Sequence, residues 1–155
     1  MIVSDTRSSM CAVSDLRLTE LPQYASYRGE LTVVEGQKDF PFVIARVFTI
    51  RSPAGTIRGD HAHQRCAQFL TCCQGTVEVV CDDGTERKSF ILDRGNVGLL
   101  VPPGIWFSEI FRGDKSVLVV ICNCPYDEND YIRDYVEFLA WRGTNMVPFG
   151  GRSKR

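Results

Sequence analysis

The two histidines of the chain, His61 and His63, stand two residues apart. In a β-strand alternate side chains point to the same face, so both imidazoles are expected to project into the same interior. An unperturbed histidine has a pKa of about 6.5, so either ring can accept or donate a proton near neutral pH. The pair is therefore a candidate acid–base centre, suited to moving a proton between neighbouring carbons through an enediol. The alternative is that both rings only satisfy hydrogen bonds inside a polar barrel.

Other side chains near the pair are candidates for holding a ligand. Arg58 could hold a phosphate or a keto oxygen, because its guanidinium stays charged and makes forked contacts; the alternative is a surface ion pair with Asp60. Gln68 could bond a sugar hydroxyl or orient a histidine, or it could be paired inside the barrel. Trp106 could stack on a planar base, although a buried tryptophan more often only packs.

The elements that must position these residues are short strands. Apolar, β-branched runs recur about every 8–12 residues with turn signals between them, a pattern typical of an all-β sandwich or barrel. The runs cover residues 40–50, 68–73, 76–81, 86–92, 98–101 and 117–122. Apolar residues at helical spacing over 130–142 predict one short C-terminal helix. The acidic run 127–130 before it is interpreted as a solvated turn at the helix N-terminus, where negative charge is favourable.

Length and composition predict one globular domain. The chain has 155 residues, of which 44% are hydrophobic and 24% charged, and its net charge is −1. Without an excess of positive charge, nucleic-acid binding is not expected. No apolar run reaches the length of about 18 residues needed for a membrane span. We expect a leader over residues 1–24, a barrel domain over 25–142 and a tail over 143–155.

The seven cysteines indicate the compartment. Their number is odd, and most lie in strand-like apolar runs rather than in loops. This distribution favours free buried thiols in a reducing environment over a secreted disulfide framework. The first twenty residues contain no apolar run of signal-peptide length. The sequence therefore predicts a cytoplasmic protein.

The histidine pair also fits the spacing of the first cupin metal motif, and residues 102–107 fit the second. Two of the metal-ligand positions hold other residue types. Gln68 stands where the motif has a glutamate, and Phe107 stands where it has the last histidine. A neutral amide and a phenyl ring cannot supply the missing charge and lone pair. We therefore predict an antiparallel cupin or jelly-roll barrel without a tightly bound metal or other cofactor. A metal-dependent cupin enzyme is a third-placed alternative.

Longer motifs are more specific than this spacing. The chain contains Arg58-Gly59-Asp60-His61-Ala62-His63 and, near its end, Asp130-Tyr131-Ile132-Arg133-Asp134-Tyr135. Further matching segments lie at residues 29–36, 41–42, 46–48, 68–70, 98–103, 105–106 and 125–129. Over about residues 25–140 the chain resembles the sugar 3,4-ketoisomerases, cupins that act on dTDP-4-oxo-6-deoxyglucose.

The resemblance implies a metal-independent isomerase of deoxysugar and polysaccharide biosynthesis. Such enzymes take a proton from C3 of a 4-keto sugar and return one at C4. His61 and His63 match the family's histidine pair, Arg58 and Gln68 match its pocket residues, and Arg46 and Trp106 are further predicted substrate-binding residues. The family also implies a dTDP-sugar substrate and a homodimer that exchanges N-terminal strands.

Three departures from the family pattern lie near the expected pocket. Thr49 replaces a common tyrosine, Gln64 replaces a common lysine or arginine, and Phe107-Ser108 replaces a frequent His-Glu pair. They leave the histidine pair intact and leave the identity of the sugar open. Which histidine is the base, and the stereochemistry at C4, also stay open. The alternative function is a non-catalytic nucleotide-sugar-binding module.

Overall fold

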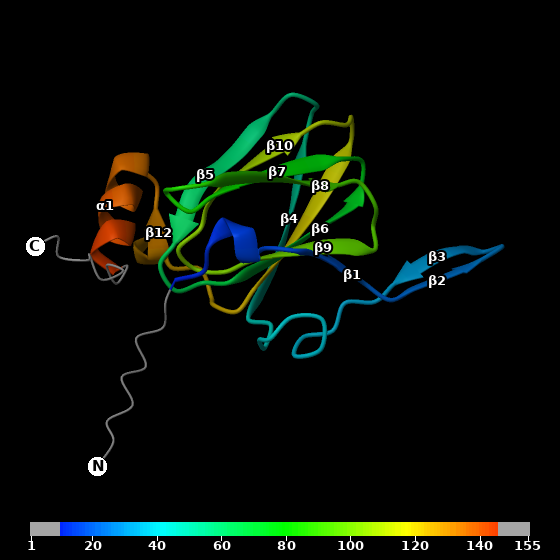
Figure 1. Ribbon diagram of the computed structural model, residues 1–155. Coiled ribbons are helices and arrows are strands. Elements are labelled where there is room, and N and C mark those ends of the chain that lie inside the picture. The colour runs from blue at the N-terminus through cyan, green and yellow to red at the C-terminus, as the bar shows by residue number, and fades with distance from the viewer. Residues whose placement is uncertain (1–9, 146–155) are drawn as a thin grey trace, which may run out of the picture.

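The computed structural model describes residues 10–145, and its regular structure is almost entirely antiparallel β-sheet (Figure 1). One sheet has the strand order β1 (Leu18–Glu20), β9 (Val97–Val101), β6 (Gln68–Gln74), β11 (Ser116–Cys122) and β4 (Arg46–Ser52). The other has the order β12 (Tyr131–Ile132), β5 (Ile57–His63), β10 (Trp106–Phe111), β7 (Val77–Asp82) and β8 (Arg87–Leu92). The predicted all-β architecture is confirmed.

The core lies between the two sheets. The inward faces contribute Leu70 and Leu118 from the first sheet and Val79 and Phe107 from the second, all at most 1% exposed. Burial alternates along β10, where Phe107, Glu109 and Phe111 are inside and the residues between them are only half-buried. This alternation is the signature of a strand with one face on the core.

The packed structure begins earlier than the expected boundary at residue 25. A 3₁₀ turn, η1 (Val13–Asp15), and β1 precede that point, and Val13, Leu16 and Leu21 are buried. The backbone N–H of Val13 donates to Asp83 Oδ2 at 2.8 Å, which fixes the segment to the far sheet. Sequence inspection misses this segment because its apolar residues are spaced among charged ones. Residues 1–9 and 146–155, the rest of the leader and most of the tail, lie outside the described residues.

The C-terminal helix is present but starts later than the spacing predicts. The helix α1 spans Tyr135–Asn145, and a short 3₁₀ turn, η2 (Glu128–Asp130), and β12 precede it. Tyr131 pairs with His63 in the sheet, so its backbone is not available to a helix. Asp134 accepts a hydrogen bond from the backbone N–H of Glu137 at 2.9 Å, an N-terminal cap that sets where the helix begins. The helix packs Phe138 against Ala62 and Ile132.

A bulge in β5 decides which side chains face the interior. Phe107 on β10 pairs with His61, whereas the next residue, Ser108, pairs with Gly59, so β5 carries one extra residue at Asp60. Gly59 and Asp60 both have positive φ, 81° and 54°. Residues three apart in a regular strand lie on opposite faces; the extra residue brings Arg58 and His61 to the same face.

A two-stranded hairpin extends away from the sheets (Figure 1). It consists of β2 (Gln23–Ser26) and β3 (Gly29–Thr32), which pair only with each other. Its side chains are mostly exposed, including Tyr24 and Leu31. Within residues 10–145, no helix is long and apolar enough to cross a membrane.

Candidate active site

A cavity of about 230 Å³ opens between the two sheets. It is lined by Phe48 and Ile50 of β4, Arg58, Gly59 and His61 of β5, Gln68 of β6, Glu109 of β10, and Tyr131 and Arg133 at and just after β12. Both sheets therefore contribute to one small, polar space. The structure brings the predicted residues Arg58, His61 and Gln68 together here.

His61 is the histidine that faces this cavity. Its ring lies edge-on to His63 at a centroid distance of 5.1 Å and contacts Phe107 and Tyr131 at 5.0 and 5.1 Å. Burial, together with the nearby His63, lowers the pKa of His61 to about 4. The ring is therefore neutral near pH 7 and able to accept a proton.

His63 lies behind it and is held by a carboxylate. Its Nδ1 is 2.9 Å from Asp130 Oδ2, and both side chains are almost fully buried. Asp130 also accepts hydrogen bonds from the backbone N–H groups of Arg65 and Cys66, at 2.7 and 3.2 Å. Although burial alone would raise the pKa of Asp130, these hydrogen bonds lower it. The network assigns the proton to Nδ1 of His63 and leaves Nε2 as an acceptor without a hydrogen-bond partner among the described residues.

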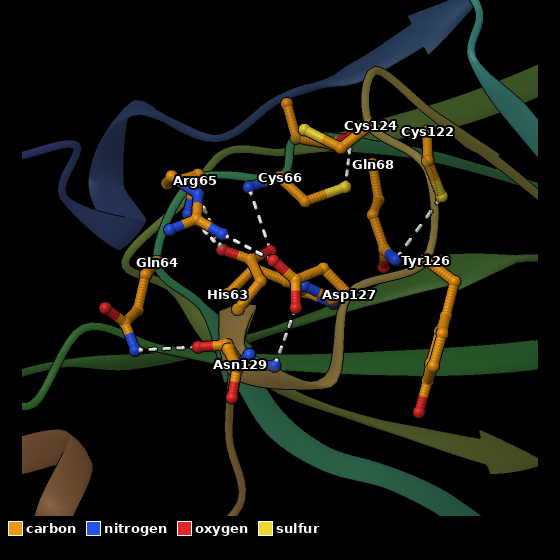
Figure 2. A network of polar contacts seen from close by, with 12 residues as sticks. His63, Gln64, Arg65, Cys66, Gln68, Cys122, Cys124, Tyr126, Asp127 and Asn129 are labelled. Carbon is orange, nitrogen blue, oxygen red and sulfur yellow. Dashed lines mark hydrogen bonds and ion pairs between the residues drawn. The ribbon is translucent and has the colours of Figure 1, made fainter.

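The interpretation of the acidic run 127–130 as a solvated turn holds for its exposed first three residues and is wrong for Asp130. Asp130 is 4% exposed and joins His63 to the segment that follows it. Figure 2 shows the surroundings, in which His63, Arg65 and Cys66 face the loop that carries Asp127 and Asn129. Burial lowers the pKa of His63, and the hydrogen bond to Asp130 opposes that effect.

The residues at the cupin metal-ligand positions come together but do not fit a metal with three histidines and a carboxylate. Phe107 packs against His61, and Gln68 lines the same cavity. A second group, His63, Cys66 and Asp130, places its ligand atoms within 4.8 Å of one another. Its carboxylate already accepts three hydrogen bonds, which account for its position.

Gln68 and Arg46 meet at a cysteine rather than in open space. Gln68 Nε2 donates to Cys122 Sγ at 3.5 Å, and Arg46 Nη2 donates to the same sulfur at 3.6 Å. Hydrogen bonds from Cys66, Arg46 and Gln68 lower the pKa of the Cys122 thiol against the effect of burial. Arg46 does not line the cavity; its guanidinium lies over the rings of Phe48 and Tyr126.

Other predicted pocket residues lie on the outer faces of the sheets. Trp106 faces away from the cavity and packs against Tyr135 and Phe138, at centroid distances of 5.3 and 5.6 Å. Thr49 is exposed on the outer face of β4. Ser108 is also outside, where its hydroxyl donates to Asp60 Oδ1 and holds the bulge. Of the three departures from the family pattern, only Phe107 touches the histidines.

Three polar side chains that line the cavity were not predicted as site residues: Glu109, Tyr131 and Arg133. Glu109 is 3% exposed, and burial raises its pKa to about 7, an effect that Arg58 partly offsets. It was missed because residues 106–111 were not recognised as a strand. If the strand alternation is continued from the inward-facing Phe107, Glu109 is also predicted to face inward. A glutamate on an apolar inward face is a signal for function.

The sequence of this chain is similar to that of a known family. The family model described as FdtA, WxcM-like, C-terminal, matches residues 14–143. This chain belongs to that family. It is 39% identical over 115 residues to the TDP-4-oxo-6-deoxy-α-D-glucose-3,4-oxoisomerase of Aneurinibacillus thermoaerophilus, covering 74% of this chain and 83% of that protein.

Solved structures of sugar 3,4-ketoisomerases have a similar fold. A 3,4-ketoisomerase from Helicobacter canadensis superposes with a TM-score of 0.80 at 35% identity, covering 83% of this chain and 98% of that one. The sugar 3,4-ketoisomerase QdtA from Thermoanaerobacterium thermosaccharolyticum, in complex with TDP, gives 0.82 at 31% identity, covering 88% and 100%. The predicted family, the cupin-type fold and the assignment as an isomerase are confirmed.

Proposed function

We propose that this chain is a nucleotide-sugar 3,4-ketoisomerase that interconverts a 4-keto and a 3-keto 6-deoxyhexose carried on dTDP. The observation that carries the proposal is the neutral His61 at a polar cavity, backed by the buried pair of His63 and Asp130. The 39% identity to a TDP-4-oxo-6-deoxyglucose oxoisomerase supports the choice of substrate.

In the proposed reaction His61 is the base. It takes the proton from C3 of the 4-keto sugar, an enediol forms, and His61 returns a proton to C4. The proton on C3 is acidic because the carbonyl at C4 delocalises the resulting charge. His63, fixed by Asp130, packs edge-on against His61 and holds its ring in place. General acid–base catalysis of this kind contributes about 10²–10⁴-fold to the rate.

The cavity sets how the substrate lies. Its volume of about 230 Å³ is below the roughly 300–1,000 Å³ of pockets that take drug-sized ligands. It therefore suits the sugar ring, with the nucleotide outside. In this proposal Arg58 bonds the keto oxygen and Gln68 bonds a ring hydroxyl, which is supported by their place in the cavity lining. Trp106 and Arg46 lie outside the cavity lining and are proposed only as supports for the surrounding strands.

The test is proton NMR of dTDP-4-oxo-6-deoxyglucose with the protein in D₂O. We expect signals of a 3-keto product with deuterium at the reacting carbons, and the configuration at C4 can be read from the same spectrum. His61→Asn should lower turnover by about 10³-fold, since it removes the base. Thr49→Val, on the outer face of the neighbouring strand, is the matched control and should behave as wild type.

Two results would contradict this function. Full turnover by His61→Asn would exclude the mechanism. Saturable binding of the dTDP-sugar without product or deuterium incorporation would instead support the binding-module alternative.

We also propose that the chain forms a homodimer through exchange of N-terminal strands and acts in the cytoplasm in polysaccharide biosynthesis. The exposed β2–β3 hairpin, in which Tyr24 and Leu31 are 66% and 58% exposed, supports a second copy as its partner. The seven free cysteines favour a reducing compartment. Light scattering on the full chain, compared with Leu31→Asp, tests the dimer; a monomeric mass for both would reject it.

A further inference from the structure

Glu109 is the buried carboxyl group that the mechanism above does not use. Its side chain is 3% exposed and lines the cavity. Among the described residues it makes no side-chain hydrogen bond and no ion pair. Its neighbours on the inward face of β10 are Phe107 and Phe111, so an apolar side chain would fit the same position. The Glu109 carboxyl group therefore borders the cavity rather than being sealed in the apolar core, where an unpaired polar group would cost stability.

The obvious partner of Glu109 is close but does not pair with it. Arg58 is its register neighbour on β5, and the bulge turns both side chains toward the cavity. Their charged groups nevertheless form no ion pair within 4 Å. The two side chains therefore border open space with unused hydrogen-bonding capacity. That arrangement suits a ligand that bonds to both.

The surroundings favour the protonated carboxyl. Val79 on the neighbouring strand β7, and Phe48 and Ile50 on β4 of the facing sheet, are apolar. The titratable or charged groups that border the space are Arg58 and His61 on β5, with Asp60 on the outer side of that strand. Tyr131 on β12, which pairs with β5, and Arg133 just after it complete the set. Burial raises the pKa of Glu109 to about 7, against the effect of Arg58, so both of its protonation states are accessible near neutral pH.

We propose that Glu109 is a second catalytic residue of the isomerase, which carries the hydroxyl proton between O4 and O3 of the sugar. This proposal rests on the proposed function, because it names the group that completes that reaction. A ketoisomerase must move two protons. One passes from C3 to C4, and the other leaves O3 and is gained by O4.

The two halves of the reaction then balance within the cavity. In the first half, His61 takes the C3 proton while protonated Glu109 donates its proton to O4; the C3–H bond breaks, a C3=C4 double bond forms and the product is the neutral enediol. In the second half, the Glu109 carboxylate takes the proton from O3 while His61 gives its proton to C4; a C3=O3 bond forms and the 3-keto sugar results. Both residues return to their starting states, and no co-reactant is needed.

The other polar groups around the cavity are less suited to this transfer. The guanidinium of Arg58 has only donors and no acceptor, so it can orient an oxygen but cannot take the O3 proton. His63 is held behind His61, with its Nδ1 bonded to Asp130. Gln68 has no exchangeable charge, and its amide bonds to Cys122. Glu109 combines access to the cavity with a proton that it can both give and take.

The experiment compares wild type, Glu109→Gln, Glu109→Asp and the control Glu78→Gln. Glu78 lies on the adjacent strand β7, where its carboxylate is paired with Arg112 outside the cavity. With dTDP-4-oxo-6-deoxyglucose in D₂O, two rates are measured, namely formation of the 3-keto product and exchange of deuterium into C3 of the recovered substrate. Values of kcat/KM are recorded across pH for each variant.

We expect Glu109→Gln to lower the rate of product formation by about 10²-fold or more, because the glutamine amide can bond O4 but cannot take the O3 proton. The rate of deuterium exchange at C3 should fall by a factor at least tenfold smaller than that. Wild-type kcat/KM should fall above about pH 7, as Glu109 loses its proton, and this fall should be absent in Glu109→Gln. Glu109→Asp should recover part of the activity and the fall. Glu78→Gln should match wild type.

Different results identify different failures. A wild type that neither converts the sugar nor exchanges its C3 proton contradicts the proposed function itself. If the wild type is active and Glu109→Gln keeps its rate, the role of Glu109 is wrong. The proposed role of Glu109 is also wrong if, in Glu109→Gln, product formation and C3 exchange fall by the same factor and kcat/KM still declines above about pH 7. A residue with only a structural role would give that result.

Discussion

Two polar clusters lie next to each other in this barrel, and they differ in how completely their groups are paired. In the first, Asp130 bonds His63 and two backbone N–H groups, so its carboxylate is satisfied and buried. In the second, around the cavity, Arg58 and Glu109 face the same space without bonding to each other. The adjacent histidines of one strand therefore have different environments. The paired cluster fixes positions, and the unpaired cluster is available for a substrate.

The pKa values of the two buried carboxyl groups, Asp130 and Glu109, are shifted in opposite directions for different reasons. Hydrogen bonds keep Asp130 ionised in spite of burial. Glu109 has no such donors, so burial prevails and its pKa rises to about 7. The same side-chain chemistry thus serves as a fixed anion in one cluster and as a titrating group in the other.

The substitution with the largest expected effect is Asp130→Asn, in the paired cluster. The substitution keeps the shape but removes the charge, and the amide N–H₂ can place the proton of His63 on the wrong nitrogen. We expect the free energy of unfolding to fall by about 2–3 kcal/mol, since buried backbone donors lose a charged acceptor, and kcat to fall by about 10²-fold. Denaturant titration and turnover measure the two effects.

Asp127→Asn is the control for that change. Asp127 lies in the same loop, but its carboxylate pairs with Arg65 at the surface. Loss of an exposed pair costs little, typically below about 1 kcal/mol. Equal losses in the two variants would mean that burial and pairing do not distinguish the clusters.

The unpaired cluster predicts a change in the opposite direction. In the folded protein the pKa of Glu109 is raised from 4.5 to about 7, so its contribution to stability is complete below about pH 4.5 and is lost as pH rises through 7. Glu109→Gln should remove that loss. At about pH 8 the variant should be more stable than wild type by roughly 2–3 kcal/mol, with little difference near pH 4. Thermal unfolding across pH measures it, and a variant that is less stable at pH 8 would contradict the environment assigned to Glu109.

The smallest expected effect is at the hydrogen bond that connects the outer face to the bulge. Ser108→Ala removes the donor to Asp60, and we expect a loss of about 0.5–1 kcal/mol in unfolding free energy and a few-fold rise in KM. The imidazoles stay in place, so kcat should change less than KM. A large fall in kcat with unchanged KM would show that Ser108 acts on the acid–base groups instead.

Much of the site was predictable from residue types and spacing, and the remainder depended on backbone geometry. His61 and His63 are predicted by their alternating spacing, and Arg58 and Gln68 by their positions relative to that pair in the cupin and family motifs. Asp130 was assigned to solvent because it belongs to an acidic run, and only the pairing of β12 with β5 shows that the chain turns inward there. Glu109 was overlooked because β10 was not recognised as a strand.

The boundaries failed for similar reasons. Tyr131 and Tyr135 are four apart, which is helical spacing, but Tyr131 pairs with a strand and the cap at Asp134 starts the helix later. Val13 and Leu16 are too few to suggest packing, although both are buried. The bulge had a local signal, since a glycine inside a strand often marks one, but its effect on Arg58 required the register with β10.

The extra residue at Asp60 reverses the parity of β5. Before it, the even-numbered Arg58 points inward; after it, the odd-numbered His61 and His63 do. In the first half of the strand even-numbered residues point inward, and in the second half odd-numbered residues do. Deleting Asp60 would leave Arg58 and His61 two residues apart in a single alternation, so both side chains would still point inward. The bulge therefore changes the sequence spacing between Arg58 and His61 while the two side chains keep one shared face.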